Sequence, residues 1–464
     1  MLDSTTRLTS ALYGTLGAQY VHTADLAQWS HDATDTFALP AIVVEPGSSE
    51  EVAVVVKLAG QFSVPIVTRG AGSGLAGGAV SEGGLILSLA RLNRVIEIDA
   101  PAMTVTAEAG VVTGDLQVAV EALGLFYPPD PASLSWCSIG GNVAVNAGGP
   151  RALKYGMTRN YVLGMTVVLA DGQTLRLGGK AHKQASGYSL MHLFIGAEGT
   201  LGIITEVTLR LLPLPPVRAT LTALFSSLDA ASNAVTAVLH SGILPCTIEL
   251  MDHATLVAIE NLLHLGLPQD AGAMMLVEQD GGDARAVRDE LRWVQATCEA
   301  HGGQRVEIAT DEQERARLWA ARRNVYNSMV AAAPNLYVED VVVPRSAIPQ
   351  MVARIEQIAA ETGVKIAVAG HAGDGNVHPC ILFDANDPVQ AAAAILAEGQ
   401  IVRAALDLGG MISGEHGVGS LKRGYLEAGV GPAALDLMRT LKRTLDPHNL
   451  LNPGKVLPDV EISR

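Results

Sequence analysis

A glycine-rich loop, Arg69–Gly78, is the feature that most constrains the fold of this chain. It follows the β-branched stretch Val64–Thr68, which predicts a strand, and it contains the spacing Gly72-x-Gly74-x-x-Gly77 of a dinucleotide-binding motif. In that motif a helix begins within the glycines and continues. Here Ser81–Gly84 interrupts, and Leu85–Leu89 predicts another strand. We therefore expect a loop whose main-chain N–H groups bind a pyrophosphate without a helix dipole; the alternative is a merely flexible loop.

Two later glycine-rich stretches carry imidazoles. His371–Pro379 contains His371 and His378, and Ser413–Gly419 contains Glu415 and His416. Three imidazoles and a carboxylate suit one divalent metal, with one imidazole left to act as a base. The alternative is two ordinary turns with surface histidines.

Composition excludes several classes of protein. With 464 residues, 48% hydrophobic and 17% charged, the chain is globular, and its length suggests about three domains of ~150 residues. A net charge of −15 argues against nucleic acid as a partner. No apolar run approaches the ~18 residues of a transmembrane helix, so we expect no membrane span.

The four cysteines and the N-terminus indicate the compartment. The cysteines lie far apart and form no CxxC pair, which argues against an iron–sulfur cluster in this chain and fits a reducing environment. The first residues lack the basic start and apolar core of a signal peptide. We expect a cytoplasmic protein.

The order of predicted elements gives an α+β fold in four parts. Residues 1–35 form a helical segment, with Leu8, Leu12 and Leu16 four apart. Residues 36–215 form the domain with the glycine loop, and the proline-rich stretch Leu211–Pro216 is a linker. Residues 216–440 form a substrate or cap domain with the metal site, and residues 441–464 close the fold. In the cap domain we expect a strand at 273–278 and helices at 282–301, 311–332 and 391–408.

Several longer motifs resemble one family. They are Val67–Gly72, Ser138–Ala144, His371–Asn376 and Ile381–Asn386. Through them the chain resembles FAD-linked 2-hydroxyacid dehydrogenases of the vanillyl-alcohol-oxidase flavin fold. That family includes D-lactate dehydrogenases, D-2-hydroxyglutarate dehydrogenase and the FAD-binding D subunit of bacterial glycolate oxidase, and the resemblance covers about residues 20–457. It implies a two-part FAD-binding domain, a cap domain and a C-terminal segment that returns to the flavin.

The resemblance also implies which residues bind FAD. Those at the pyrophosphate would be Arg69, Gly70, Ala71, Gly72, Ser73, Gly74, Leu75, Gly77 and Gly78. Those along the flavin would be Pro129, Asp130, Ser133, Ser138, Gly140, Gly141 and Asn142, with Asn452 at the isoalloxazine. Those at the adenine end would be Glu198, Gly199 and Ile203. Ser73 and Gly74 stand where some relatives carry a flavin-linked histidine, so we expect non-covalent FAD.

The same resemblance implies the catalytic residues. His371, His378 and Glu415 would ligate zinc or manganese, and His416 would be the base. The metal would make the substrate hydroxyl easier to deprotonate, and the α-hydrogen would leave as hydride to the flavin. Arg322 would bind the substrate carboxylate.

Two positions bear on the substrate. Relatives that use hydroxyglutarate carry a lysine and a threonine where this chain has Val338 and Tyr326, which favours a small monocarboxylate such as D-lactate or glycolate. Alternatives are a D-2-hydroxyglutarate dehydrogenase, an electron-relay subunit of a multi-subunit oxidase, and a lactone or aromatic-alcohol oxidase. Because the reduced flavin must pass its electrons on, we expect an electron-acceptor protein or iron–sulfur subunit as partner, which could hold the protein at the inner membrane.

Overall fold

The computed structural model describes residues 4–459, and they form two compact units. Unit 1 comprises the described residues of Met1–Ala147, Met157–Leu214 and Glu415–Arg464. Unit 2 comprises Gly148–Gly156 and Pro215–Gly414. The change at 214/215 falls in the expected linker. The expected boundary at 440/441 differs from the structure, which changes units at 414/415 because residues 418–420 hydrogen-bond to Glu198 and Ala76 of unit 1.

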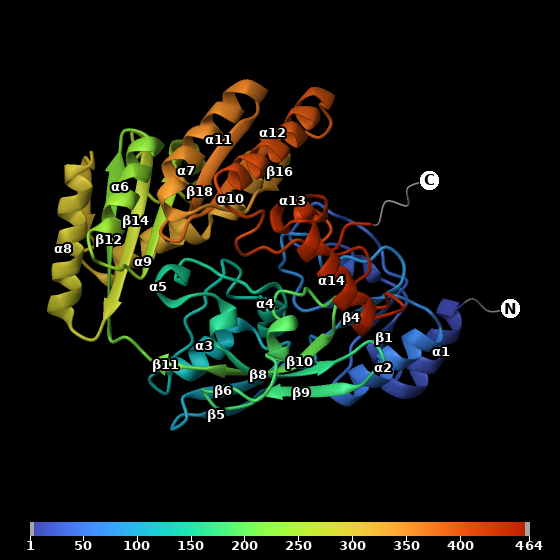
Figure 1. Cartoon of the computed structure of the whole chain (residues 1–464). Helices are drawn as coiled ribbons and strands as arrows, with labels where there is room; N and C mark the ends of the chain where they lie inside the picture. The colour runs from blue at the N-terminus through green and yellow to red at the C-terminus, as the bar shows by residue number, and fades with distance from the viewer. Residues whose placement is uncertain (1–3, 460–464) are drawn as a thin grey trace. The chain divides into compact units, whose positions relative to one another are not determined.

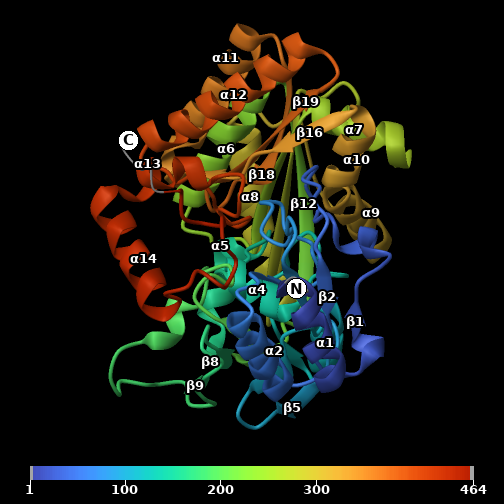
Figure 2. The same ribbon diagram turned by 90° about the vertical axis from the view of Figure 1, so that its right-hand side faces the viewer.

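A four-stranded sheet and two helices form the first part of unit 1. The strands are, in order, β1 (Val21–His22), β2 (Ile42–Val44), β4 (Leu85–Ser88) and β3 (Ile66–Arg69). β4 runs parallel to both β2 and β3. Helices α1 (Ser4–Leu16) and α2 (Ser49–Gln61) lie side by side (Figure 2), and the N-terminal segment shares one core with the sheet instead of forming a separate part.

The glycine loop connects two strands of this sheet, as the sequence predicts. β3 ends at Arg69, the next regular element is β4, and no helix begins within Gly70–Gly84. A dinucleotide fold of the helix-opening type is therefore excluded for this loop.

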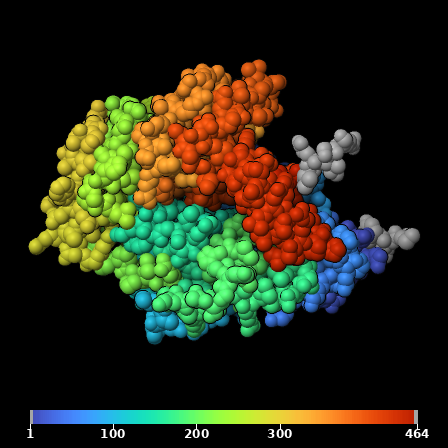
Figure 3. Space-filling model, in the orientation of Figure 1, coloured from blue at the N-terminus to red at the C-terminus, as the bar shows by residue number. Residues whose placement is uncertain are grey.

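An antiparallel five-stranded sheet forms the second part of unit 1. Its strands are β5 (Val95–Asp99), β6 (Thr104–Glu108), β10 (Ile203–Arg210), β8 (Val162–Val168) and β9 (Thr174–Gly178), in that order. Figure 1 shows α4 on one face of this sheet. The remaining elements of unit 1 are β7 (Leu125–Phe126), β11 (Leu212–Pro213), α3 (Thr113–Glu121), α4 (Ile139–Val145), α13 (Leu426–Val430) and α14 (Pro432–Leu445). The last of these lies at the surface of unit 1 (Figure 3).

Unit 2 is built on an antiparallel eight-stranded sheet. Its strands follow the order β15 (Arg305–Ile308), β12 (Val217–Phe225), β14 (Ala273–Gly281), β13 (Thr247–Asp252), β18 (Lys365–His371), β19 (Asn376–Phe383) and β16 (Asn335–Val338), and β17 (Val341–Val342) also pairs with β19. β18 and β19 form a hairpin whose last pair is His371 and Asn376. His371 and His378 therefore lie on strands beside a tight turn, not on a long loop.

Helices cover both faces of this sheet (Figure 2). One layer contains α6 (Leu228–His240), α8 (Ala284–Ala300), α11 (Ile348–Thr362) and α12 (Pro388–Asp407). The other contains α7 (His253–Leu263), α9 (Glu312–Arg323) and α10 (Val325–Ala332). The short helix α5 (Ala152–Tyr155) also belongs to unit 2.

Among the described residues, α12 is the one helix long and apolar enough to cross a membrane by length and composition. Its most apolar stretch is 39% buried within the protein. The helix packs against α11 and β19, so part of its apolar surface belongs to the fold of unit 2.

Candidate active site

The glycine loop offers main-chain donors to an anion. Within the described part of the chain, the N–H groups of Gly70–Gly78 donate to no protein acceptor. Ser73, Gly74 and Leu75 are half-buried, and a Cβ on Gly74 would meet nothing within 4 Å. Unused N–H groups beside open space fit a pyrophosphate.

The buried side chain of Arg69 supports this loop from behind. Its Nη1 donates to the carbonyls of His31 at 2.8 Å and Ala79 at 3.3 Å. Burial lowers the pKa of Arg69, an effect that Asp32 opposes. Gly72 has φ +75°, and a Cβ there would lie 2.2 Å from Arg69, so the glycine lets the loop fold over the guanidinium.

The stretch that follows Cys137 forms a helix, which the sequence did not predict. Ser138 caps α4 by accepting a hydrogen bond from Gly141 N–H at 3.4 Å. A Cβ on Gly140 would lie 2.5 Å from that of Ala109, so this glycine is required by close packing. The Asn142 amide donates to Thr113 Oγ1 at 2.7 Å. Gly140 and Asn142 therefore have structural roles apart from any cofactor.

The segment from Tyr127 to Ser133 has no regular secondary structure, as its prolines predict. Gln117 Nε2 donates to the carbonyls of Tyr127 at 2.9 Å and Pro129 at 2.8 Å. Ser133 O accepts from the N–H groups of Trp136 at 2.9 Å and Cys137 at 2.8 Å. Asp130 and Ser133 are half-buried within this braced segment.

Glu198 and Asn452 connect three parts of unit 1. The Glu198 carboxylate is buried and accepts from Val418 N–H at 2.6 Å and Gly419 N–H at 2.8 Å. Asn452 donates to Glu198 O at 2.6 Å and accepts from Thr68 N–H at 2.8 Å. A Cβ on Gly199 would lie 2.9 Å from Asn452 Nδ2, and the Ile203 side chain belongs to the core. These contacts show how the C-terminal segment is held beside the start of the glycine loop.

Burial raises the pKa of Glu198 from 4.5 to about 7. The two N–H donors and the charge of Lys455 lower it in part. Lys455 Nζ in turn donates to the carbonyl of Gly77 in the glycine loop at 2.7 Å.

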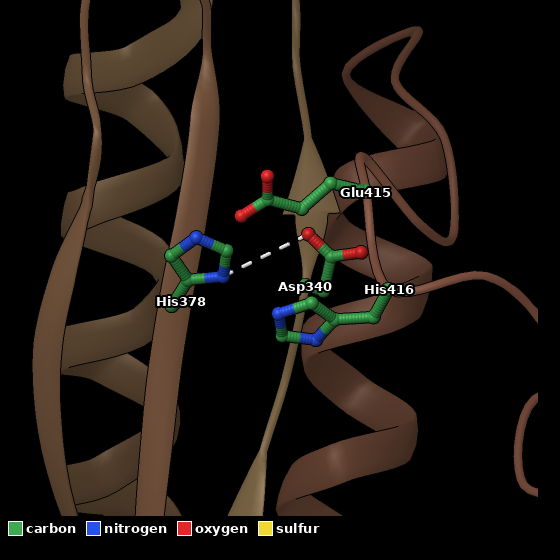
Figure 4. Close-up of side chains that lie close together, drawn as sticks. All are labelled: Asp340, His378, Glu415 and His416. Atoms are coloured by element: carbon green, nitrogen blue, oxygen red, sulfur yellow. Dashed lines mark ion pairs between the residues drawn. The ribbon is translucent and has the colours of Figure 1, made fainter. Parts of the chain in front are cut away.

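Four titratable side chains converge where the chain passes from Gly414 to Glu415. One ligand atom from each of Asp340, His378, Glu415 and His416 lies within 4.8 Å of the other three (Figure 4). His371, an expected ligand, is not in this set, although its ring centroid lies 5.1 Å from that of His378. Two carboxylates and two imidazoles are a donor set that zinc or manganese accepts, so these residues fit a divalent metal.

Asp340 is the member of this cluster that the sequence analysis missed. Its Oδ2 accepts from Ser413 Oγ at 2.6 Å and Gly414 N–H at 2.9 Å, and its Oδ1 lies 3.7 Å from His378 Nδ1. It thus fixes the backbone directly before Glu415. Two consecutive acids between the apolar residues Val338 and Val341 were the available signal.

A buried carboxylate, Glu249, contacts both His371 and Arg322. Its oxygens lie 2.8 and 2.9 Å from His371 Nδ1 and 2.5 Å from Arg322 Nε. Burial alone would raise the pKa of Glu249, but the positive charge of Arg322 and the hydrogen bonds with His371 and Arg322 hold it below its ordinary value. The sequence contains no signal for Glu249. It lies in a strand whose residue pattern is ordinary, and it is 122 positions away from His371 in the chain.

The chain matches two family models. FAD linked oxidases, C-terminal domain, matches residues 214–456, and FAD binding domain matches residues 40–178. The chain is 42% identical to glycolate oxidase subunit GlcD of Bacillus subtilis, over 92% of this chain and 91% of that protein. It is 36% identical to a D-lactate dehydrogenase of Anaerostipes hadrus, over 92% of each chain. The solved structure of p-cresol methylhydroxylase with substrate bound has a similar fold, with a TM-score of 0.83, 18% identity and 98% of each chain covered.

Proposed function

Because the chain belongs to the family of FAD-linked oxidases and is an FAD-dependent oxidoreductase, we propose that it oxidises a small D-2-hydroxy acid to the 2-oxo acid. The candidate substrates are D-lactate and glycolate, the acids in the names of the two relatives. The observation that carries the proposal is the convergence of Asp340, His378, Glu415 and His416. A hydroxy acid needs a base for its hydroxyl proton and a cation for its carboxylate. The cluster supplies an imidazole as the base, and Arg322 on α9 is the cation that we propose.

Arg322 binds the substrate carboxylate in this proposal. It occupies the last turn of α9 and is buried, so a carboxylate that reaches it exchanges water for a charge-assisted hydrogen bond. Glu249 accepts a hydrogen bond from Nε of the guanidinium, and in this proposal the terminal nitrogens donate to the substrate carboxylate.

His416 takes the hydroxyl proton at a ring nitrogen. An imidazole suits this task because its ordinary pKa of about 6.5 lies close to neutral pH. Its neighbour Glu415 and the nearby His378 would, with His371, hold the metal. When bound, FAD accepts two electrons and a proton from the substrate, and the metal acts as a Lewis acid toward the hydroxyl oxygen.

The FAD contacts that we propose lie in unit 1. The main chain of Arg69–Gly78 binds the pyrophosphate, and the segments of Pro129–Ser133 and Ser138–Asn142 border the flavin. Glu198 and Asn452 act through their hydrogen bonds, which hold the C-terminal segment against these loops. Gly199 leaves room for the Asn452 side chain. FAD is non-covalent in this proposal, since Ser73 and Gly74 stand where some relatives carry the flavin-linked histidine.

Val338 and Tyr326 favour a monocarboxylate. Val338 lies at the end of β16 and packs against the apolar cluster that contains Val325 and Met329. A second substrate carboxylate beside this apolar cluster would lose water without gaining a cation from Val338 or Tyr326, which is unfavourable. Oxidation of D-2-hydroxyglutarate, the second candidate function, would need a positive charge that neither Val338 nor Tyr326 supplies.

The electrons are passed to a separate protein. All four cysteines are buried and far apart in the sequence, so a cluster that accepts electrons belongs to another chain. The relative named as a glycolate oxidase subunit supports an iron–sulfur or other electron-accepting partner, and such a partner could hold this cytoplasmic protein at a membrane.

Anaerobic bleaching of the flavin tests the proposal. D-lactate, L-lactate, glycolate and D-2-hydroxyglutarate are added separately, before and after chelation and after metal is restored. Rapid bleaching by D-lactate or glycolate that chelation abolishes is the expected result. Bleaching by the diacid alone would overturn the substrate, bleaching that survives chelation would overturn the metal, and no bleaching would indicate a relay subunit.

A further inference from the structure

The carboxylate of Glu249 lies between the two groups that the proposed function uses for the metal and for the substrate. Glu249 is fully buried on β13, and Leu250 of that strand pairs with Gly370 of β18, which places Glu249 opposite His371. On the other side, Glu249 pairs with Leu276, which packs against Leu318 and Trp319 of α9. Arg322 follows on the same helix. The sheet and α9 thus direct a metal ligand and a guanidinium to one carboxylate.

The position of the hydrogen on the His371 ring determines which of its two nitrogens can bind a metal. Nδ1 lies 2.8 and 2.9 Å from the Glu249 oxygens and 3.3 Å from Arg322 Nη2. A ring nitrogen that carries a hydrogen can donate to the carboxylate but has no in-plane lone pair with which to accept from the guanidinium. The shorter, charge-assisted bond to Glu249 prevails, so Nδ1 carries the hydrogen. Nε2 is then the unprotonated nitrogen, the form that binds a metal.

The same carboxylate supplies the counter-charge of Arg322. A buried guanidinium without a partner is costly, and a nearby divalent cation would repel it. The bond from Nε to Glu249 therefore holds Arg322 in place and leaves its terminal nitrogens for another anion.

We propose that Glu249 is a positioning residue that fixes both the metal-binding tautomer of His371 and the place of the substrate-binding guanidinium of Arg322. This inference rests on the proposed function and adds a residue that acts through two others. A glutamine at this position has one oxygen and one NH₂ group. If its oxygen accepts from Arg322, its NH₂ faces His371 Nδ1 and favours the tautomer with the hydrogen on Nε2, which weakens metal binding by this ring.

Two substitutions test this role with a matched control. Glu249→Gln is compared with Glu278→Gln, which removes another buried carboxylate, on the neighbouring strand β14, that pairs with Arg315 at 3.0 Å. Affinity for Zn²⁺ and Mn²⁺ alone is measured by equilibrium dialysis of the FAD-loaded protein, without substrate. KM and kcat are measured with the acid that bleaches the flavin.

Glu249→Gln is expected to bind metal about 10- to 100-fold more weakly and to raise KM at least about 10-fold, since groups that hydrogen-bond to metal-bound histidines have effects of this size. Glu278→Gln should stay within about threefold of wild type in both. Glu249→Asp, which keeps the charge, should recover part of both losses. It replaces Glu249→Gln in the comparison if the glutamine variant does not retain FAD.

Three outcomes are distinguishable. A folded Glu249→Gln protein with wild-type metal affinity and KM overturns the positioning role alone. Equal losses in Glu249→Gln and Glu278→Gln indicate general destabilisation and also overturn it. A wild-type protein that binds neither metal overturns the metal part of the proposed function, and with it this inference.

Discussion

Glu198 accepts a hydrogen bond from the main-chain N–H of Val418 at 2.6 Å, although the two residues are 220 positions apart. Gly419 N–H donates to the second carboxylate oxygen at 2.8 Å. A Cβ on Gly417 would lie 2.8 Å from Glu198 Oε1, which explains a glycine one residue after His416. Within unit 1, one buried carboxylate therefore holds the backbone next to the proposed catalytic base.

The pKa of Glu198 predicts a pH-dependent stability. Burial raises this pKa from 4.5 to about 7, so the folded protein favours the protonated acid. This contribution to stability is fully present below pH 4.5 and is lost as the pH rises through about 7. Relative to Glu198→Gln, the wild type should lose on the order of 3 kcal/mol between these limits.

Thermal unfolding of both proteins from pH 5 to pH 8 measures this difference. The midpoint of the wild type should fall relative to that of the variant as the pH increases. Glu290→Gln, in which an acid bonded to Gln279 is replaced, is the control. A constant difference between wild type and Glu198→Gln across the range would contradict the raised pKa.

Gly419 tests the contact between the C-terminal segment and the glycine loop. It has φ +51°, and a Cβ there would lie 1.9 Å from the carbonyl oxygen of Ala76. Gly419→Ala should lower the free energy of unfolding by roughly 2 kcal/mol or more and weaken FAD binding. Gly424→Ala, where a Cβ would meet nothing within 4 Å, should change neither; similar midpoints and FAD content in the two variants would argue against this contact.

His416→Ala should abolish turnover while FAD remains bound. Removal of a general base costs about 10²- to 10⁴-fold in rate. FAD content is read from the visible spectrum, and kcat from reduction of an artificial electron acceptor. His448→Ala, at an exposed position of the C-terminal segment, is the control. Turnover retained in His416→Ala would remove the base assignment.

Asp340→Asn should weaken metal binding by about 10- to 100-fold, because it removes a negative charge next to His378. It also replaces one of the two carboxylate oxygens, which affects the hydrogen bonds that Asp340 accepts from Ser413 and Gly414. The stoichiometry and affinity for Zn²⁺ are measured after chelation and dialysis. Asp384→Asn, at the end of β19 and away from the cluster, is the control. Unchanged affinity in Asp340→Asn would place this residue outside the metal site.

Much of the local structure could be predicted from the sequence. The strand expected at Val64–Thr68, the strand at 273–278 and the helix at 282–301 are confirmed by β3, β14 and α8, with ends that differ by a few residues. Their hydrophobic periodicity and turn residues act over a few positions, which a single sequence displays. The expected helix at 311–332 is instead two helices, α9 and α10, which meet at Asn324.

Other elements depend on contacts that no local pattern contains. The sequence around Gly140 and Gly141 disfavours a helix, yet α4 forms because Ser138 caps it and Ala109 leaves room only for glycine. The resemblance indicated the FAD residues, whereas their hydrogen bonds, such as those of Asn142 with Thr113 and Asn452 with Glu198, became visible only in the fold.

The sequence by itself determined which chemical groups are available: a glycine loop between strands, and His371, His378, Glu415 and His416 in two glycine-rich stretches. These follow from residue types and short spacings, which require no knowledge of the fold. Only the tertiary structure decided the partners, by adding Asp340 to the cluster and by placing Glu249 between His371 and Arg322. The reason is physical: the pairing register of β13 with β18 and the packing of α9 on β14 set these distances, and both depend on residues far apart in the chain.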